Sequence, residues 1–244
     1  MLLEYNMNIK INAIILTTET PHHAFFVKSL MKNRNINFTV VIETIKKKPN
    51  FNVKHKLDKD FLNYENRKWF NLKNNKVKNY CNPLYSSSLN KDKKIIELLK
   101  KKTPSFVFIF GTSILSKNFL KNFKNIYNFH GGDMEKFRGL DSHLWSMYHN
   151  NFESLFTYLH EALPRVDSGK YVFKKKIKIN RNFKLASLRY QNTIQCLDMA
   201  NKFITSFKKN KLKKYKLKSL GRYYSFMPSI LKDKVIKNFK NYFI

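Results

Sequence analysis

The sequence is poor in cysteine, in long apolar runs and in acidic residues, and each shortage narrows what the protein can be. Its 244 residues include two cysteines, Cys81 and Cys196, which lie far apart and outside any C-x-x-C pattern. This usage predicts a reducing compartment and neither disulfides nor structural zinc. No apolar run approaches membrane-spanning length, and the N-terminus lacks the features of a signal peptide. We therefore expect a cytoplasmic protein without a membrane partner, translated from Met1 or from Met7.

Acidic residues are scarce, because 16 Asp and Glu stand against 48 Lys and Arg, for a formal net charge of +32. Such a charge favours a polyanionic partner. The lysines are nevertheless spread along the chain among abundant Asn and Ile. This pattern is typical of a general bias in amino-acid usage. Residues 126–170 depart from this trend, since they contain four basic and six acidic side chains and carry a net charge of −2. We expect a solvated basic surface, with attraction of an anionic substrate as the alternative.

Glycine is also scarce, and its placement is informative. The chain has six glycines. Five of them lie between residues 111 and 169: Gly111, Gly131, Gly132, Gly139 and Gly169. A sequence that uses glycine so rarely is expected to keep it where the backbone turns sharply or approaches a ligand closely. The region around residues 111–169 is therefore the predicted site.

Hydrophobic periodicity predicts an α/β protein. A strand, a helix and a strand over residues 10–16, 21–34 and 38–44 form a βαβ unit, which indicates a parallel sheet. Further strands are predicted over residues 105–110, 126–130, 152–159 and 171–179. Further helices are predicted over residues 61–70, 91–102, 114–123 and 185–207. We expect a Rossmann-like, mostly parallel sheet flanked by helices.

The chain is expected to comprise a catalytic domain over residues 1–180 and a helix with a basic and aromatic tail over residues 181–244. Residues 45–90 are rich in Lys and Asn and are a possible insertion over one edge of the sheet. The seven lysines of residues 208–218 form either a solvated linker or a polyanion contact. The aromatic tail around Tyr223, Tyr224, Phe226 and Met227 either covers the sheet edge or forms a subunit contact, so an oligomer is possible.

Three motifs follow one another in the predicted site. They are N-F-H-G-G at residues 128–132, F-R-G-L-D-S-H-L-W at 137–145 and V-D-S-G at 166–169. Together they resemble the pattern of the folate-dependent formyltransferases. F-G-T-S-I-L-S at residues 110–116 is similar to the segment that lines the folate pocket of that family. The resemblance covers about residues 8–180. It departs from the methionyl-tRNA branch, where Ser-Leu-Leu-Pro commonly follows the histidine, because residues 131–134 are Gly-Gly-Asp-Met here.

The resemblance implies transfer of a formyl group from 10-formyltetrahydrofolate to a primary amine, with Asn128, His130 and Asp167 as catalytic residues. Alternation along a strand places Asn128 and His130 on one face. Asn128 is expected to donate an N–H to the developing oxyanion and His130 to donate or shuttle a proton. The carboxylate of Asp167 is expected to raise the imidazole pKa.

The resemblance also implies a folate pocket and a substrate loop. The residues implied in folate binding are Gly111, Thr112, Ser113, Ile114, Leu115 and Val166. Candidates for ordering the loop or touching substrate are Gly131, Gly132, Arg138, Asp141 and His143. The spacing of His143, His149 and His160 matches no standard ligand set, so no metal is predicted.

The acceptor is less well specified than the reaction. We expect a nucleotide-linked amino sugar, because the residues after 179 predict no β-barrel like the one that methionyl-tRNA formyltransferases usually carry. The initiator methionyl-tRNA is the alternative acceptor, and the basic charge favours it. A third hypothesis is an inactive relative that binds RNA or another anionic polymer. The intact Asn128, His130 and Asp167 argue against that hypothesis.

Overall fold

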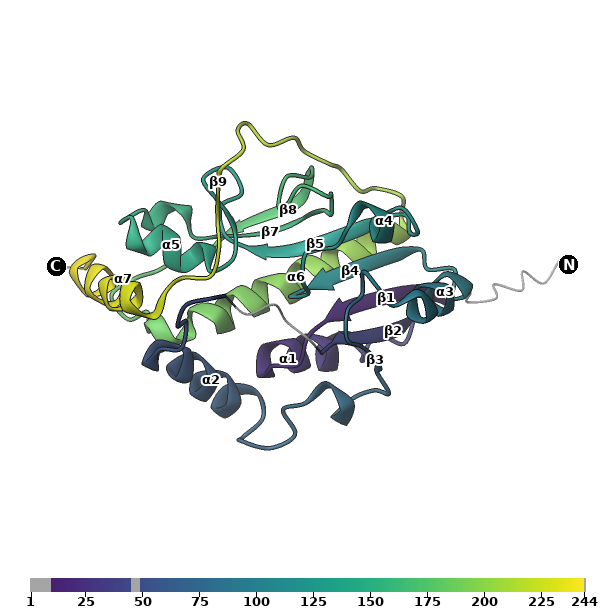
Figure 1. Ribbon diagram of the computed structural model, residues 1–244, viewed down its shortest axis with the longest axis horizontal. Coiled ribbons are helices and arrows are strands. Elements are labelled where there is room, and N and C mark those ends of the chain that lie inside the picture. The colour runs from purple at the N-terminus through teal and green to yellow at the C-terminus, as the bar shows by residue number, and fades with distance from the viewer. Residues whose placement is uncertain (1–9, 45–48, 244) are drawn as a thin grey trace, which may run out of the picture.

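A seven-stranded sheet with helices on both faces forms the centre of the protein (Figure 1). The computed structural model describes residues 10–44 and 49–243. The strand order is β3-β2-β1-β4-β5-β7-β8. These strands are β1 (Ile11–Thr17), β2 (Ile36–Glu43), β3 (Leu84–Ser86), β4 (Phe106–Phe110), β5 (Ile126–Gly131), β7 (Phe156–Glu161) and β8 (Tyr171–Lys176). The first five strands in that order are parallel, whereas β7 and β8 are antiparallel to their neighbours. The predicted fold class is confirmed.

Helices cover the sheet because its central strands are apolar on both faces. The helices are α1 (Pro21–Leu30), α2 (Lys56–Trp69), α3 (Lys93–Lys101), α4 (Lys117–Leu120), α5 (Ser142–Tyr148), α6 (Leu188–Lys208) and α7 (Ser229–Asn241). Helices α1 and α6 pack on one face, and α3 and α4 on the other. Figure 1 shows α6 running lengthwise along the sheet.

A smaller third cluster joins α2, α5 and α7 at one end of the molecule. It includes Phe61, Met147, Met227 and Val235. This cluster holds α5 beside the sheet.

Several predicted boundaries are wrong. The helix expected over residues 114–123 is confined to Lys117–Leu120, because hydrogen bonds to side chains hold residues 113–116 in a turn. The strand expected over residues 152–159 begins as a 3-10 turn at Phe152–Ser154, and the strand itself is Phe156–Glu161. The strand predicted to reach residue 179 ends at Lys176, and the helix predicted to reach residue 34 ends at Leu30.

The described part of residues 45–90 belongs to the body of the fold. Strand β3, which the sequence pattern did not predict, extends the sheet beyond β2. A 3-10 turn at Val77–Asn79 and helix α2 precede it. Trp69 of α2 stacks between Phe25 of α1 and Tyr190 of α6, at centroid distances of 4.3 and 4.9 Å. Residues 45–48, which lie in the same predicted insertion, are outside the described residues.

The C-terminal chain returns across the molecule after α6. Figure 1 shows it arching past β7 and β8 before it reaches β9 (Arg222–Tyr224). On the way, Tyr215 forms an isolated antiparallel bridge with Tyr171 at the start of β8. Strand β9 then pairs in parallel with β6 (Phe137–Gly139), and α7 packs against α5. The aromatic tail thus forms a small second sheet beside the predicted site. No helix within residues 10–44 and 49–243 is long and apolar enough to span a membrane.

Candidate active site

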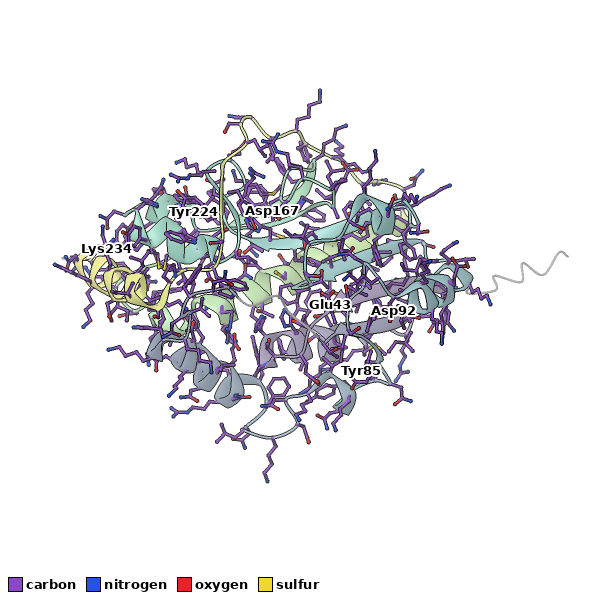
Figure 2. All side chains as sticks on the ribbon, in the orientation of Figure 1. Glu43, Tyr85, Asp92, Asp167, Tyr224 and Lys234 are labelled. Carbon is purple, nitrogen blue, oxygen red and sulfur yellow. The ribbon has the colours of Figure 1, made fainter. Side chains whose placement is uncertain are left out.

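The predicted catalytic side chains meet at the carboxyl end of β5, where open α/β sheets bind their ligands. Asn128 and His130 are two residues apart on β5, so their side chains lie on the same face of the strand. Asp167 follows β7 in the loop that leads to β8, and its φ of 46° is left-handed. In Figure 2, Asp167 lies next to the C-terminal segment that carries Tyr224.

The buried carboxylate of Asp167 is the centre of the site. Its Oδ2 lies 3.2 Å from His130 Nδ1 and accepts a hydrogen bond from the Gly139 backbone N–H at 2.8 Å. Its Oδ1 lies 3.3 Å from His160 Nε2 and accepts from Asn128 Nδ2 at 3.3 Å. We call Asn128, His130, His160 and Asp167 the carboxylate cluster. The structure therefore brings all three predicted catalytic residues together.

His160 belongs to the cluster although the motifs did not indicate it. It lies on β7 directly opposite Asn128 in the antiparallel register. Its Nδ1 is 2.8 Å from the carbonyl oxygen of Glu161, to which an Nδ1–H donates. Its Nε2 is then free of hydrogen and accepts from Asn128 Nδ2 at 3.2 Å. The antiparallel pairing of β5 with β7 places His160 here.

Electrostatics keep Asp167 ionised. Burial acts to raise its pKa, but the nearby imidazoles of His130 and His160 and the Gly139 N–H together hold that pKa well below the ordinary carboxyl value. Three donors around one buried carboxylate, from His130, Asn128 and the Gly139 backbone, explain why the charged form is stable there.

The imidazole of His130 behaves differently from the expectation. Burial is the largest influence and lowers the pKa of His130, and the opposing effect of Asp167 only partly offsets it. The expected rise in the imidazole pKa is therefore wrong in its net direction, although Asp167 does act in the predicted sense. Both ring nitrogens face acceptors, since Nε2 is 3.3 Å from the Phe137 carbonyl and Nδ1 faces Asp167. The lowered pKa keeps the ring neutral at rest. Once the ring is protonated, both of its N–H groups have acceptors.

Asn128 is more constrained than its expected role implies. Its amide nitrogen bonds to both His160 and Asp167, so both of its N–H groups have partners. An N–H from Asn128 reaches a developing oxyanion only by leaving one of them. The bond to Asp167, at 3.3 Å, is the longer of the two.

The candidates in the substrate loop bond mainly to backbone groups. Arg138 is buried and donates to the carbonyls of Gly221 and Val166, both at 2.6 Å. Asp141 accepts from the Met227 N–H at 2.8 Å, and burial raises its pKa. These contacts match the loop-ordering alternative.

His143 and the glycine pair complete that loop. His143 Nε2–H donates to the Phe156 carbonyl at 2.6 Å, and burial lowers the pKa of His143 to about 4, so the ring is neutral. A Cβ on Gly132 would lie 2.7 Å from His130 Nε2 and would overlap Ser142 at the start of α5. A Cβ on Gly131 would make tight contacts of 3.0–3.1 Å with Asn192 and His143. The glycines thus allow α5 to approach the cluster closely.

Backbone groups of the C-terminal segment also take part in this arrangement, and no sequence motif indicates them. They are the Gly221 carbonyl, the Met227 N–H and the Tyr224 carbonyl, which accepts from the Leu140 N–H at 2.9 Å. Because these are main-chain atoms, only the folded structure reveals them. The segment supports Arg138 and Asp141 from outside the predicted catalytic domain.

Five of the six residues of the predicted folate pocket form a turn after β4, whereas Val166 lies in the loop between β7 and β8. We call residues 111–115 the donor turn, after the folate contact that the sequence predicts for them. Gly111 has φ +82°, and its missing Cβ leaves room for the His23 ring. Ser113 bonds to Glu43, while Ile114 is 57% exposed and Leu115 is buried. Thr112 bonds locally to the Ser113 carbonyl, and Val166 is tied to Arg138.

Among the residues that the structure describes, no group of three His, Cys, Asp or Glu side chains has an arrangement that would hold a metal ion. Cys81 and Cys196 are both free thiols.

Comparison with known proteins agrees with the motifs. No protein-family model matches the chain. The methionyl-tRNA formyltransferase of Finegoldia magna is 28% identical over 120 residues, which are 48% of this chain and 38% of that protein. The match therefore spans less than half of that relative's length.

Solved structures share the fold over most of the chain. A sugar N-formyltransferase from a Shewanella species superposes with a TM-score of 0.63 at 13% identity, covering 93% of this chain and 87% of that one. An N-formyltransferase from Helicobacter canadensis, solved with folinic acid and dTDP-3-aminofucose, superposes with a TM-score of 0.58 at 16% identity. That superposition covers 95% of this chain and 82% of the other.

The chain thus has the formyltransferase fold. The resemblance to the folate-dependent formyltransferases that the motifs indicated is confirmed.

Proposed function

We propose that the protein is an N-formyltransferase that moves the formyl group of 10-formyltetrahydrofolate to a primary amine. The observation that carries the proposal is the carboxylate cluster, in which one buried Asp167 carboxylate holds His130 and Asn128 at the carboxyl end of β5. A buried, ionised carboxylate between two imidazoles adds little to the stability of a fold. It can, however, stabilise an imidazolium that forms during proton transfer.

In the proposed reaction, the amine nitrogen attacks the formyl carbon and a tetrahedral oxyanion forms. The bond from that carbon to folate N10 then breaks, and one proton passes from the amine to N10. His130 carries this proton, because its lowered pKa leaves the ring neutral and able to accept it. Asp167 stabilises the imidazolium that results. Asn128 releases its longer bond to Asp167 and donates that N–H to the oxyanion.

The donor turn is the proposed folate contact. It ends β4, the strand adjacent to β5, so it lies on the same edge of the sheet as the cluster. The Helicobacter canadensis structure with folinic acid supports a folate donor in this fold. We also propose that residues 1–180 form the catalytic domain, with residues 181–244 as an extension that supports Arg138 and Asp141 through main-chain contacts.

The proposed acceptor is a nucleotide-linked amino sugar. Two proteins that share the fold over most of the chain support it: the Shewanella sugar N-formyltransferase and the Helicobacter canadensis N-formyltransferase solved with dTDP-3-aminofucose. The similarity to a methionyl-tRNA formyltransferase over 120 residues favours charged initiator tRNA as the second candidate.

Release of tetrahydrofolate tests the proposal and separates the two acceptors. The full chain is incubated with 10-formyltetrahydrofolate and either a panel of nucleotide-linked amino sugars or methionyl initiator tRNA. We expect acceptor-dependent release with an amino sugar and none with His130→Ala. Release with the tRNA alone would show that methionyl initiator tRNA is the acceptor. The absence of release with every amine would refute formyl transfer.

A further inference from the structure

We infer that Glu43, which none of the sequence motifs contains, is a positioning residue for the formyl donor. It fixes the donor turn from the end of a neighbouring strand. This inference rests on the proposed function, in which the donor turn binds the folate.

Glu43 is the last residue of β2, and only 2% of its surface is exposed. Its Oε2 accepts a hydrogen bond from the Ser113 backbone N–H at 2.7 Å. Its Oε1 accepts from the Ser113 hydroxyl at 2.8 Å and from the Leu89 N–H at 3.1 Å. Figure 2 shows Glu43 well away from Asp167, on the part of the sheet formed by the first strands.

The carboxylate has no cationic partner among residues 10–44 and 49–243. Two backbone N–H groups and one hydroxyl hold it instead. A buried carboxylate is costly unless its lone pairs are used, so these three donors and Glu43 stabilise one another. The geometry of the turn at Ser113 is therefore tied to the end of β2.

A second side chain holds the turn from the other side. Asn90 donates from Nδ2 to the Ile114 carbonyl at 2.8 Å and accepts from the Ser116 N–H at 2.8 Å. Ser116 in turn caps α4 by accepting from the Phe119 N–H. Glu43 and Asn90 thus replace the helical hydrogen bonds that residues 113–116 lack.

The result is a turn with fixed side-chain directions. Leu115 points into the core and is 6% exposed, whereas Ile114 remains 57% exposed. An apolar side chain held outward by a rigid turn is ready to cover part of a flat ligand. Preorganisation of this kind increases affinity, because binding does not have to order the loop.

Glu43→Gln tests the inference. Glutamine keeps the size of the side chain but replaces one acceptor oxygen with an NH₂ group, so either the Ser113 N–H or the Leu89 N–H loses its acceptor. Loss of one charge-assisted bond predicts that the Kd for folinic acid and the KM for 10-formyltetrahydrofolate rise by about tenfold to a hundredfold. The value of kcat at saturating donor is expected to stay within about twofold of wild type, because Glu43 touches no reacting atom.

The matched control is Glu97→Gln. Glu97 is an exposed residue of α3 whose partner is Lys100 one turn later. This variant is expected to keep the wild-type Kd and KM. Hydrogen exchange of the amides in residues 111–116 is expected to accelerate in Glu43→Gln and to remain unchanged in Glu97→Gln.

Ser113→Ala is the second variant, which replaces Glu43→Gln in the test if the latter does not fold. It removes only the hydroxyl bond to Glu43 and leaves the backbone bond, so a smaller rise in Kd and KM is expected. A folded Glu43→Gln with wild-type Kd and KM, or a Ser113→Ala with both constants unchanged, would overturn the inference. If the wild-type chain itself neither binds folinic acid nor releases tetrahydrofolate, the proposed function fails instead.

Discussion

The two halves of the proposed site are built in opposite ways. In the carboxylate cluster, side chains from two paired strands bond to one another around a buried charge. In the donor turn, side chains from distant segments bond to the backbone and leave Ile114 exposed. The first arrangement sets the protonation states of the side chains, whereas the second fixes the backbone conformation of the turn. Substitutions in the cluster should therefore change kcat, and substitutions around the turn should change donor binding.

The largest effect is expected from Asp167→Asn. The neutral amide no longer compensates an imidazolium at His130, so kcat should fall by about 10⁴-fold, the order seen when an Asp that orients a catalytic His is replaced by Asn. Binding of folinic acid, measured by calorimetry, should remain near the wild-type value. A variant with weakened donor binding and an unchanged kcat would erase the distinction between the two halves.

A smaller loss is expected from Asn128→Ala. Removing one oxyanion donor typically lowers kcat by about 10²- to 10³-fold. Asn128 also bonds to His160 and Asp167, so circular dichroism and thermal unfolding are needed beside the kinetics. An Asn128→Ala protein that is folded and retains full turnover would remove Asn128 from the chemistry.

A more modest effect is expected where the C-terminal segment meets the cluster. Arg138→Met leaves the Gly221 and Val166 carbonyls without their donor, which should lower the free energy of unfolding by about 1–3 kcal/mol. Since the Val166 carbonyl immediately precedes Asp167, kcat should fall as well. The control is Arg34→Met on the exposed surface, which should change neither quantity. Equal behaviour of the two variants in denaturant titrations and assays would show that Arg138 does not support the cluster.

The smallest effect is a shift in pH dependence. His130 accepts a proton only while neutral, so kcat/KM should be constant above its lowered pKa and should fall as the pH falls through that value. The neighbouring His160 contributes to lowering the pKa of His130. His160→Gln should therefore raise that pKa and move the acidic limb of the pH profile to higher pH. His149→Gln, at an exposed position, should leave the limb in place, and a shift of the His160→Gln limb to lower pH would contradict the assignment.

The sequence predicted the residues whose relation is local or set by strand alternation. Asn128 and His130 are two residues apart on one strand, and the Asp-Ser-Gly turn marks Asp167. The parallel sheet followed from the apolar strands and the first βαβ unit. These features need no knowledge of long-range register.

Relations set by register or by main-chain atoms were not predictable. His160 joins the cluster only because β7 pairs antiparallel with β5 and places it opposite Asn128. The net direction of the pKa change at His130 depends on burial, which the motifs do not report. Residues 114–116 have a helical pattern in the sequence, but bonds from Glu43 to the Ser113 N–H and from Asn90 to the Ser116 N–H hold this segment in a turn.

The central claim is tested most directly by following the formyl group itself. Wild-type chain and His130→Ala are each mixed with 10-formyltetrahydrofolate labelled with carbon-13 in the formyl group and with nucleotide-linked amino sugars, and the acceptors are analysed by mass spectrometry. We predict that one amino sugar gains a single labelled formyl group for each tetrahydrofolate released, in the wild-type reaction only. Unlabelled acceptors, with equal tetrahydrofolate release by the wild type and by His130→Ala, would contradict the account.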